Sequence, residues 1–331
     1  MSVSNWRQWL RWLAPVAVLV VVLVILRDEL PFFGEAWGAV RAASIGPLLA
    51  AVATAVLSLA AMAGVMQILL NVEGRITGVA RTNAITFASN AWSTTMPGGP
   101  AISAWLTFRV HRLWGASVGL CGWFFVVSGA LSTVWMVLIG VVAVALLGAE
   151  LSAWSLLLSL LAAVATIGAV FWATLHPAVL KRWVRFLPEK VHARVVGVID
   201  QVSAIRISTP AFFAAAGLSL ANRLLDLATM VFAVWAVAGQ GAPLAGVCLA
   251  FIMTKLAGSA QVTPGGLGTV EPVAVGMLVA GGLPLATATA ATMVYRAVSF
   301  ALITAIGWVI YAAVYAGRGF MAGRPSAGEA V

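Results

Sequence analysis

The sequence carries little charge for its length. Only 9% of its 331 residues are Asp, Glu, Lys or Arg, while 62% are hydrophobic. A soluble domain carries about 25% charged residues. Apolar runs such as 13–26, 45–70 and 115–147 approach or exceed the roughly 20 residues that a helix needs to cross a bilayer. No alternating ten-residue pattern of barrel strands is present, so we predict an all-α, polytopic integral membrane protein.

Cysteine, histidine and catalytic motifs are also scarce. Cys121 and Cys248 both lie in apolar segments, where we interpret them as small buried hydrophobic residues that imply no disulfide or metal framework. His111, His176 and His192 fall in expected loops and are too scattered for a metal site. The chain lacks HExxH, GxSxG, Walker and CxxC motifs. We therefore expect no metal, no cofactor and no enzyme activity, and interpret the net charge of +9 as loops beside anionic lipid rather than a nucleic-acid site.

Hydropathy predicts six full spans. The first is expected to be an uncleaved anchor rather than a signal peptide, because no small-residue cleavage site follows it and Arg27-Asp28-Glu29 comes directly after. The spans are 10–26, 45–70, 115–147, 152–175, 210–238 and 285–316.

Two further apolar stretches, 83–104 and 244–283, are interrupted by Pro-Gly-Gly. The first contains MPGGPAIS at 96–103 and is rich in Asn, Ser and Thr; the second contains TPGGLGTVE at 263–271. We predict that each is a re-entrant helical hairpin, which enters the membrane and turns back. The alternative is an ordinary surface turn between tilted spans. The expected tips are Pro97, Gly98 and Gly99 in the first hairpin and Pro264, Gly265, Gly266 and Gly268 in the second.

The distribution of basic residues supports this predicted topology. With both hairpins re-entrant and both termini cytoplasmic, only Arg27 and Arg41 lie outside. Fourteen lie inside, which agrees with the positive-inside rule for a cytoplasmic (inner) membrane: Arg7, Arg11, Arg75, Arg81, Arg109, Arg112, Lys181, Arg182, Arg185, Lys190, Arg194, Arg206, Arg318 and Arg324.

The same predicted topology implies an inverted-topology repeat within a single transmembrane domain, 1–331. Repeat 1 covers about 45–147 and repeat 2 about 210–316, and their hairpins enter from opposite faces. The alternative is a coincidence of two helix-breaking turns. Between the repeats, 176–208 mixes aromatic and basic residues and is expected to form an amphipathic helix on the cytoplasmic surface. The tail 317–331 is expected to be disordered.

Polar residues in the apolar segments are the candidate substrate-binding site. Irregular backbone at membrane depth must be buried in protein or line a wet cavity, and half-helix N-termini suit a phosphate. Charged side chains within the apolar segments are costly in free energy, and they usually face the protein interior or a water-filled pathway. Arg223 and Asp226 are alternatively a structural pair three residues apart, and Lys255 and Arg296 alternatively snorkel to an interface. The candidates are Asn90, Arg223, Asp226, Lys255, Glu271 and Arg296; three bases against two acids leave one positive charge for a phosphodiester.

The stretch TPGGLGTVEPVAVGML, with the earlier polar segment that ends in MPGG, resembles the lysylphosphatidylglycerol synthase transmembrane-region family. The resemblance covers roughly 10–316. It implies a flippase-like fold with re-entrant helices that moves phospholipid or lipid-linked sugar between leaflets. Glu271 matches the acidic residue that closes the second motif, whereas the first motif here, PGGPAISAWLTFR, lacks an acid. The aminoacyl-transferase domain of larger relatives is absent from this sequence.

Three functions follow from these observations. The first is a flippase that moves a phosphate-containing lipid, such as an aminoacylated phospholipid, a polyprenyl-phosphate sugar or a glycolipid. The second is a non-transporting accessory subunit that binds an envelope biosynthesis enzyme through 176–208. The third, an intramembrane lipid-modifying enzyme, is disfavoured because no histidine or paired carboxylates lie in the predicted spans.

Overall fold

The structure is a computed structural model that describes residues 41–96, 98–147, 205–259 and 263–316, together with residues 179, 182, 196, 197 and 200. All regular structure in these ranges is helical, and no strand occurs among them. Four of the described helical stretches are long and apolar enough to cross a membrane: Ile45–Leu70, Val118–Ala143, Thr209–Ala238 and Leu285–Ala316. The prediction of an all-α membrane protein is confirmed.

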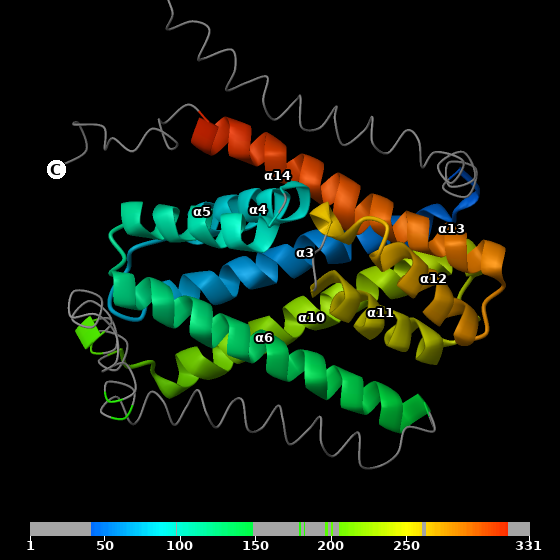
Figure 1. Ribbon diagram of the computed structural model, residues 1–331, viewed down its shortest axis with the longest axis horizontal. Coiled ribbons are helices and arrows are strands. Elements are labelled where there is room, and N and C mark those ends of the chain that lie inside the picture. The colour runs from blue at the N-terminus through cyan, green and yellow to red at the C-terminus, as the bar shows by residue number, and fades with distance from the viewer. Residues whose placement is uncertain are drawn as a thin grey trace, which may run out of the picture.

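Two long helices, α3 (Ile45–Leu70) and α10 (Thr209–Ala238), form the centre of the molecule. They pack side by side although more than 130 residues separate them in sequence (Figure 1). The 26 residues of α3 extend over about 39 Å, enough to cross a bilayer. Pro210 lies in the first turn of α10, where its missing N–H costs no hydrogen bond, and Gly239 follows its last residue.

The first Pro-Gly-Gly separates two helices, α4 (Val79–Thr95) and α5 (Gly99–Leu113). Met96 has extended backbone and Gly98 has a φ of 67°, so the chain reverses direction here. The two helices pack against each other, and α6 (Val118–Leu147) follows. This hairpin is longer than the expected 83–104, because helical structure continues on both sides of that segment.

The second Pro-Gly-Gly lies in a similar hairpin. Helix α11 (Leu244–Ser259) leads to the short 3-10 turn η1 (Pro264–Gly266), and α12 (Val270–Ala280) returns. The last stretch is one continuous helical path with two wider turns. It consists of α13 (Leu285–Arg296), the π-helical segment η2 (Ala297–Leu302), α14 (Ile303–Tyr311) and the π-helical segment η3 (Ala312–Ala316).

The two hairpins lie toward opposite ends of the molecule, with their tips near its middle (Figure 1). The contacts agree with this view, since α4 of the first hairpin touches η1 of the second and packs along α14. At Gly307 of α14 the helices approach closely, because a Cβ there would lie 2.3 Å from the Phe87 carbonyl oxygen.

The buried apolar residues form three separate clusters, and the two larger ones are each built largely around one hairpin. The first joins the end of α3 to α4, α5 and the start of α6, and includes the aromatic group Trp92, Trp308 and Tyr311, whose ring centroids are 5.2–5.8 Å apart. The second joins α10 to α11, α12 and α13 around Phe251 and Met230. A smaller third cluster joins the start of α3 to Phe87, Val298 and Ile303.

Several sequence-based expectations fall on residues outside the described ranges. These are the spans 10–26 and 152–175, most of the amphipathic segment 176–208, the tail 317–331 and the tip residue Pro97.

Candidate functional site

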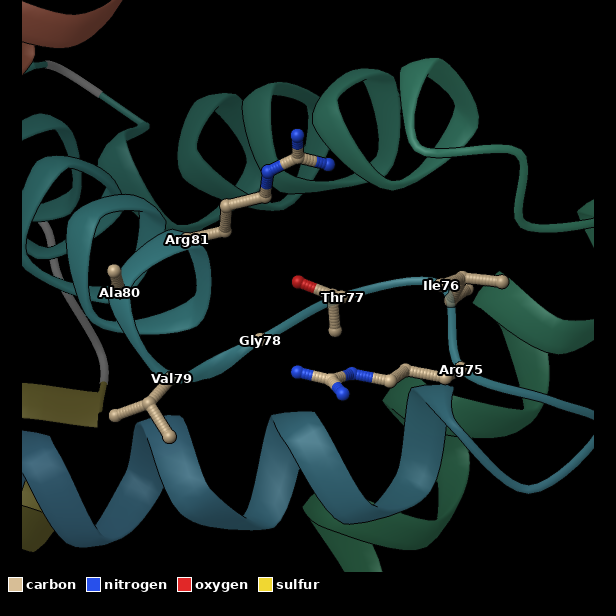
Figure 2. A pocket seen from close by; sticks show the side chains of 7 residues that line it. All are labelled: Arg75, Ile76, Thr77, Gly78, Val79, Ala80 and Arg81. Atoms are coloured by element: carbon tan, nitrogen blue, oxygen red, sulfur yellow. The ribbon is translucent and has the colours of Figure 1, made fainter.

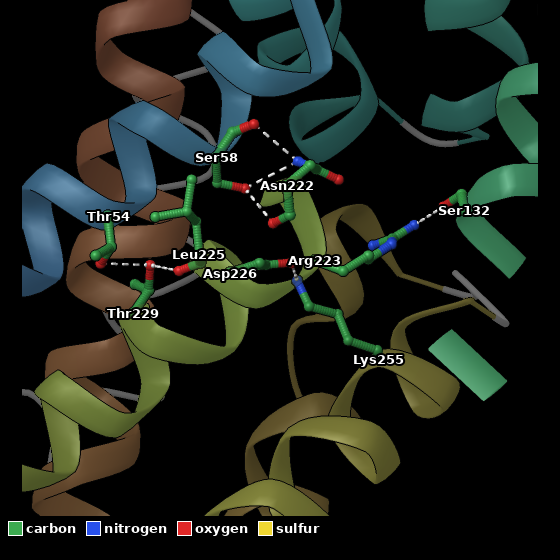
Figure 3. Close-up of polar contacts among 9 residues, drawn as sticks. All are labelled: Thr54, Ser58, Ser132, Asn222, Arg223, Leu225, Asp226, Thr229 and Lys255. Carbon is green, nitrogen blue, oxygen red and sulfur yellow. Dashed lines mark hydrogen bonds and ion pairs between the residues drawn. The ribbon is translucent and has the colours of Figure 1, made fainter. Parts of the chain in front are cut away.

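Polar side chains join α3 to α10 at the centre of the molecule (Figure 3). The Asn222 amide nitrogen donates to the Ser58 carbonyl oxygen at 2.8 Å and to the Ser58 hydroxyl at 2.9 Å. That hydroxyl donates back to the Asn222 carbonyl at 3.0 Å, and one turn further the hydroxyls of Thr54 and Thr229 lie 3.0 Å apart. These bonds satisfy polar groups away from water and fix how the two helices are aligned.

One helical turn beyond Asn222 on α10, an ion pair lies in the apolar interior. Asp226 on α10 accepts from Lys255 on α11, with 2.6 Å between Oδ2 and Nζ. The ammonium also lies 5.4 Å from the centroid of the Phe251 ring. The side chains of Lys255 and Asp226 are only 30% and 18% exposed. The predicted alternative of a pair between Arg223 and Asp226 is wrong, because Asp226 pairs with Lys255.

Arg223 instead reaches toward α6, where its guanidinium donates to the Ser132 hydroxyl (Figure 3). Its Nε is buried without a hydrogen-bond partner, and no carboxylate among the described residues forms an ion pair with it. Arg223 therefore carries a positive charge that no carboxylate among the described residues balances, since Asp226 is already paired with Lys255. A half-buried guanidinium with free donor capacity is suited to an anion.

A second ion pair lies at the tip of the second hairpin. Arg296 Nε is 2.7 Å from Glu271 Oε1, and the Arg296 guanidinium donates to the Gly265 carbonyl at 2.9 Å. The other oxygen of Glu271 accepts from the backbone N–H of Gly268 at 2.8 Å. Arg296 also lies 4.6 Å from the Phe300 ring centroid. Half-helix N-termini were expected to suit a phosphate, and the backbone N–H of Gly268, just before α12, is bonded here to the chain's own carboxylate.

The helix changes geometry directly after Arg296, where α13 passes into the π-helical segment η2. Such wider turns are rare and occur frequently at functional sites. Buried Tyr295, which precedes Arg296, interacts electrostatically with Lys255, Asp226 and Arg296. We call Arg223, Asp226, Lys255, Glu271 and Arg296 the charged cluster.

The tips of the two hairpins meet beside the charged cluster. Gly265 has a φ of 60°, and a Cβ on it would lie 2.2 Å from the Phe300 ring and 3.0 Å from the Thr94 carbonyl oxygen. The Thr94 hydroxyl lies 2.9 Å from the hydroxyl of Thr304, which is in α14. Close packing at this point requires a glycine.

Five of the six predicted site residues therefore belong to one cluster, while Asn90 does not join it. Asn90 lies on α4, where its carbonyl accepts from Thr94 at 2.9 Å, and its side chain makes no hydrogen bond to the described residues. His111, expected in a loop, is fully buried in α5, where its Nε2 lies 3.4 Å from the Met66 sulfur. No group of metal-ligating side chains occurs among the described residues.

Sequence reasoning missed the partners that hold the charges. Ser132, Asn222 and Tyr295 are ordinary residues within apolar runs, and their spacing gives no signal of contact with another helix. Thr292, four residues before Arg296 on the same face of α13, also has a buried hydroxyl without a partner among the described residues. Unpartnered polar groups beside a charged cluster are suited to a polar ligand or to water.

The profile of the lysylphosphatidylglycerol synthase transmembrane-region family matches residues 11–307 of the chain. The chain belongs to this family. The match covers both hairpins and the charged cluster, so the resemblance noted at TPGGLGTVE extends to nearly the whole protein. The family takes its name from the membrane region of lysylphosphatidylglycerol synthases. No curated protein sequence matches the chain.

Proposed function

We propose that this protein is a lipid transporter of the flippase type, not an enzyme, and that it moves a phosphate-containing lipid between membrane leaflets. Membership of a family of membrane domains connected with lipid handling supports the lipid substrate. The observation that carries the proposal is the charged cluster, because Arg223 lies in apolar surroundings without a carboxylate partner among the described residues. An anionic headgroup would supply the missing negative charge.

The proposed architecture is an inverted repeat. In it, α3, the α4–α5 hairpin and α6 correspond to α10, the α11–α12 hairpin and the path from α13 to η3. The hairpins enter from opposite faces, both termini are cytoplasmic, and the protein lies in the inner membrane. Three observations support this arrangement: the matching order of helix, hairpin and helix, the meeting of the two tips, and the positive-inside count.

In the proposed mechanism a lipid phosphate competes with Glu271. The carboxylate holds both Arg296 and the Gly268 N–H, which are the groups that a phosphate at the tip would need. A headgroup attracted by Arg223 would displace Glu271, and a proton on the released carboxylate would couple transport to pH. Rocking of one repeat against the other would then expose the headgroup to the opposite leaflet while the acyl or prenyl chains stay in the bilayer.

Reconstitution tests this proposal. The purified chain is placed in liposomes with a panel of fluorescent lipids, and leaflet exchange is measured for the parent, Arg223→Gln, Arg296→Ala and Glu271→Gln. We expect Arg223→Gln and Arg296→Ala to weaken lipid binding and slow exchange by about tenfold or more, since hydrogen bonds to charged groups contribute about 1.5–3 kcal/mol. Glu271→Gln removes the competitor, so binding persists while exchange slows.

The control is Arg206→Gln, which removes one exposed positive charge outside the cluster and leaves exchange unchanged. Exchange at the protein-free rate for every lipid would refute transport and favour the alternative, a non-transporting accessory subunit of an envelope biosynthesis enzyme. If all three cluster variants exchange lipid as fast as the parent, the assignment of the site fails.

A further inference from the structure

A second polar site lies far along the chain from the charged cluster, in the loop between α3 and α4. Residues 75–81 line a hollow of about 430 Å³ (Figure 2). Arg75 and Arg81 are exposed on its two sides, and neither forms an ion pair with a described residue. Glu73, the acidic residue of this loop, does not line the hollow.

Hydrogen bonds from Asn71 give the loop a defined shape. Its side-chain oxygen accepts from the backbone N–H of Ile76 at 2.9 Å and of Thr77 at 3.1 Å, and its nitrogen donates to the Thr77 carbonyl at 3.0 Å. The loop therefore does not rely on Arg75 or Arg81 for its conformation. Both guanidinium groups stay available for a ligand.

The hollow also contains the N-terminus of α4. Gly78 is the N-cap residue and offers no side chain, and no side-chain hydrogen bond caps this end. The first N–H groups of a helix point outward without internal partners and attract anions. Val79, Ala80 and Arg81, which carry these groups, all line the hollow.

An unpartnered hydroxyl marks the floor of the hollow. Thr77 is only 4% exposed, and its Oγ1 has no hydrogen-bond partner in the described part of the chain. Figure 2 shows this oxygen directed between Arg75 and Arg81. A buried hydroxyl without a partner costs free energy, and the cost is removed when a ligand accepts a hydrogen bond from it.

We propose that residues 75–81 bind the phosphate group of an anionic membrane lipid. Two guanidinium groups, a hydroxyl and free backbone N–H groups around one hollow are the donors that a phosphate prefers. The loop ends the membrane-crossing helix α3, and Val79 at its rim is 63% exposed, so an acyl chain has an apolar surface beside it. The proposal is independent of transport through the charged cluster.

The experiment titrates the detergent-solubilised full chain with short-chain phosphatidylglycerol and separately with inorganic phosphate, and measures heat of binding and thermal unfolding. We expect saturable binding of the lipid and only weak binding of inorganic phosphate. Arg75→Gln with Arg81→Gln weakens lipid binding about tenfold or more, because charge-assisted hydrogen bonds are lost. Arg206→Gln, the matched exposed arginine, binds as the parent does.

Thr77→Val separates binding from folding. It removes only the hydroxyl, so the ligand-free protein unfolds at the same or a higher temperature while lipid binding weakens severalfold. A merely structural threonine would give the opposite pattern, with lower stability and unchanged binding, and that result would overturn the proposal.

Two further outcomes would also overturn it. One is an Arg75→Gln, Arg81→Gln variant that keeps the parent's affinity, and the other is tight binding of inorganic phosphate with none of the lipid. The titration is repeated on Arg223→Gln. Lipid binding that is lost only in that variant belongs to the charged cluster, so failure of this site is distinguishable from failure of the proposed transport function.

Discussion

At the scale of single residues, Gly265 is a position where both the backbone conformation and the surrounding space exclude a side chain. Its positive φ disfavours any side chain, and the neighbouring Phe300 ring and Thr94 carbonyl leave no room for a Cβ. Its own carbonyl meanwhile accepts from Arg296. One glycine thus joins the tip of the second hairpin to the first hairpin and to the charged cluster.

We predict that Gly265→Ala destabilises the protein and slows lipid exchange. The left-handed conformation alone costs an L-residue roughly 1–2 kcal/mol, and the contact with Phe300 adds to it. The measurement is unfolding in detergent together with the liposome assay. Gly276→Ala is the control, because a Cβ there meets nothing within 4 Å and alanine favours helix. Equal stability of the two variants would contradict the tip geometry.

The charged residues themselves could be predicted from sequence, because a charge within an apolar run is conspicuous. Their pairing could not. Spacing placed Arg223 and Asp226 on one face of α10, but Asp226 bonds to Lys255 and Arg223 to Ser132. Those partners come from other helices, and contacts between helices depend on packing that local spacing does not encode. The expectation that His111 lies in a loop was wrong for a related reason. Helix α5 extends to Leu113, so His111 is helical and packs in the core.

At the scale of elements, hydropathy located the described long helices well and the hairpins only in outline. The predicted 45–70 agrees with α3 in both bounds, because Ser44 and Asn71 flank an unbroken apolar run. The first hairpin extends from Val79 to Leu113, beyond the expected 83–104. Arg81, Arg109 and Arg112 lowered the hydropathy of its outer turns, although helix formation continues through them.

The packing of α4 against α14 depends on Gly307. We predict that Gly307→Ala destabilises this contact by about 1–3 kcal/mol, the typical cost of overpacking. The new Cβ would lie 2.3 Å from the Phe87 oxygen and 2.8 Å from the Ala91 Cβ. The measurement is the midpoint of thermal unfolding. Gly129→Ala in α6, where a Cβ meets nothing within 4 Å, leaves the midpoint unchanged or raises it. A similar drop in both variants would contradict the close approach of α4 and α14 at Gly307.

At the scale of the whole molecule, the two proposed repeats touch through α3 with α10 and through α4 with α14. Motion of one repeat against the other must change at least one of these contacts. The contact between α4 and α14 lies beside the tips, where the hydroxyls of Thr94 and Thr304 are 2.9 Å apart.

A disulfide at this contact tests the motion. We predict that Thr94→Cys with Thr304→Cys, in a chain whose Cys121 and Cys248 are replaced by alanine, stops lipid exchange when oxidised and recovers it on reduction. The two sulfurs would start near bonding distance. Each single cysteine variant serves as the control, and unchanged exchange in the oxidised double variant would rule out rocking at this contact.

The bonds between Ser58 and Asn222 also bear on how the protein is made. Their partners lie 164 residues apart, so at 5–20 residues per second α3 waits roughly 8–30 s for α10 to emerge. During that interval the hydroxyls of Thr54 and Ser58 lie in the membrane without the side chains that later bond them. The Thr54 hydroxyl can already donate to the carbonyls of Ala50 and Ala51 in its own helix, whereas the Ser58 hydroxyl has to wait for Asn222. We therefore expect the alignment of α3 with α10 to be fixed only after the second half of the chain has been synthesised.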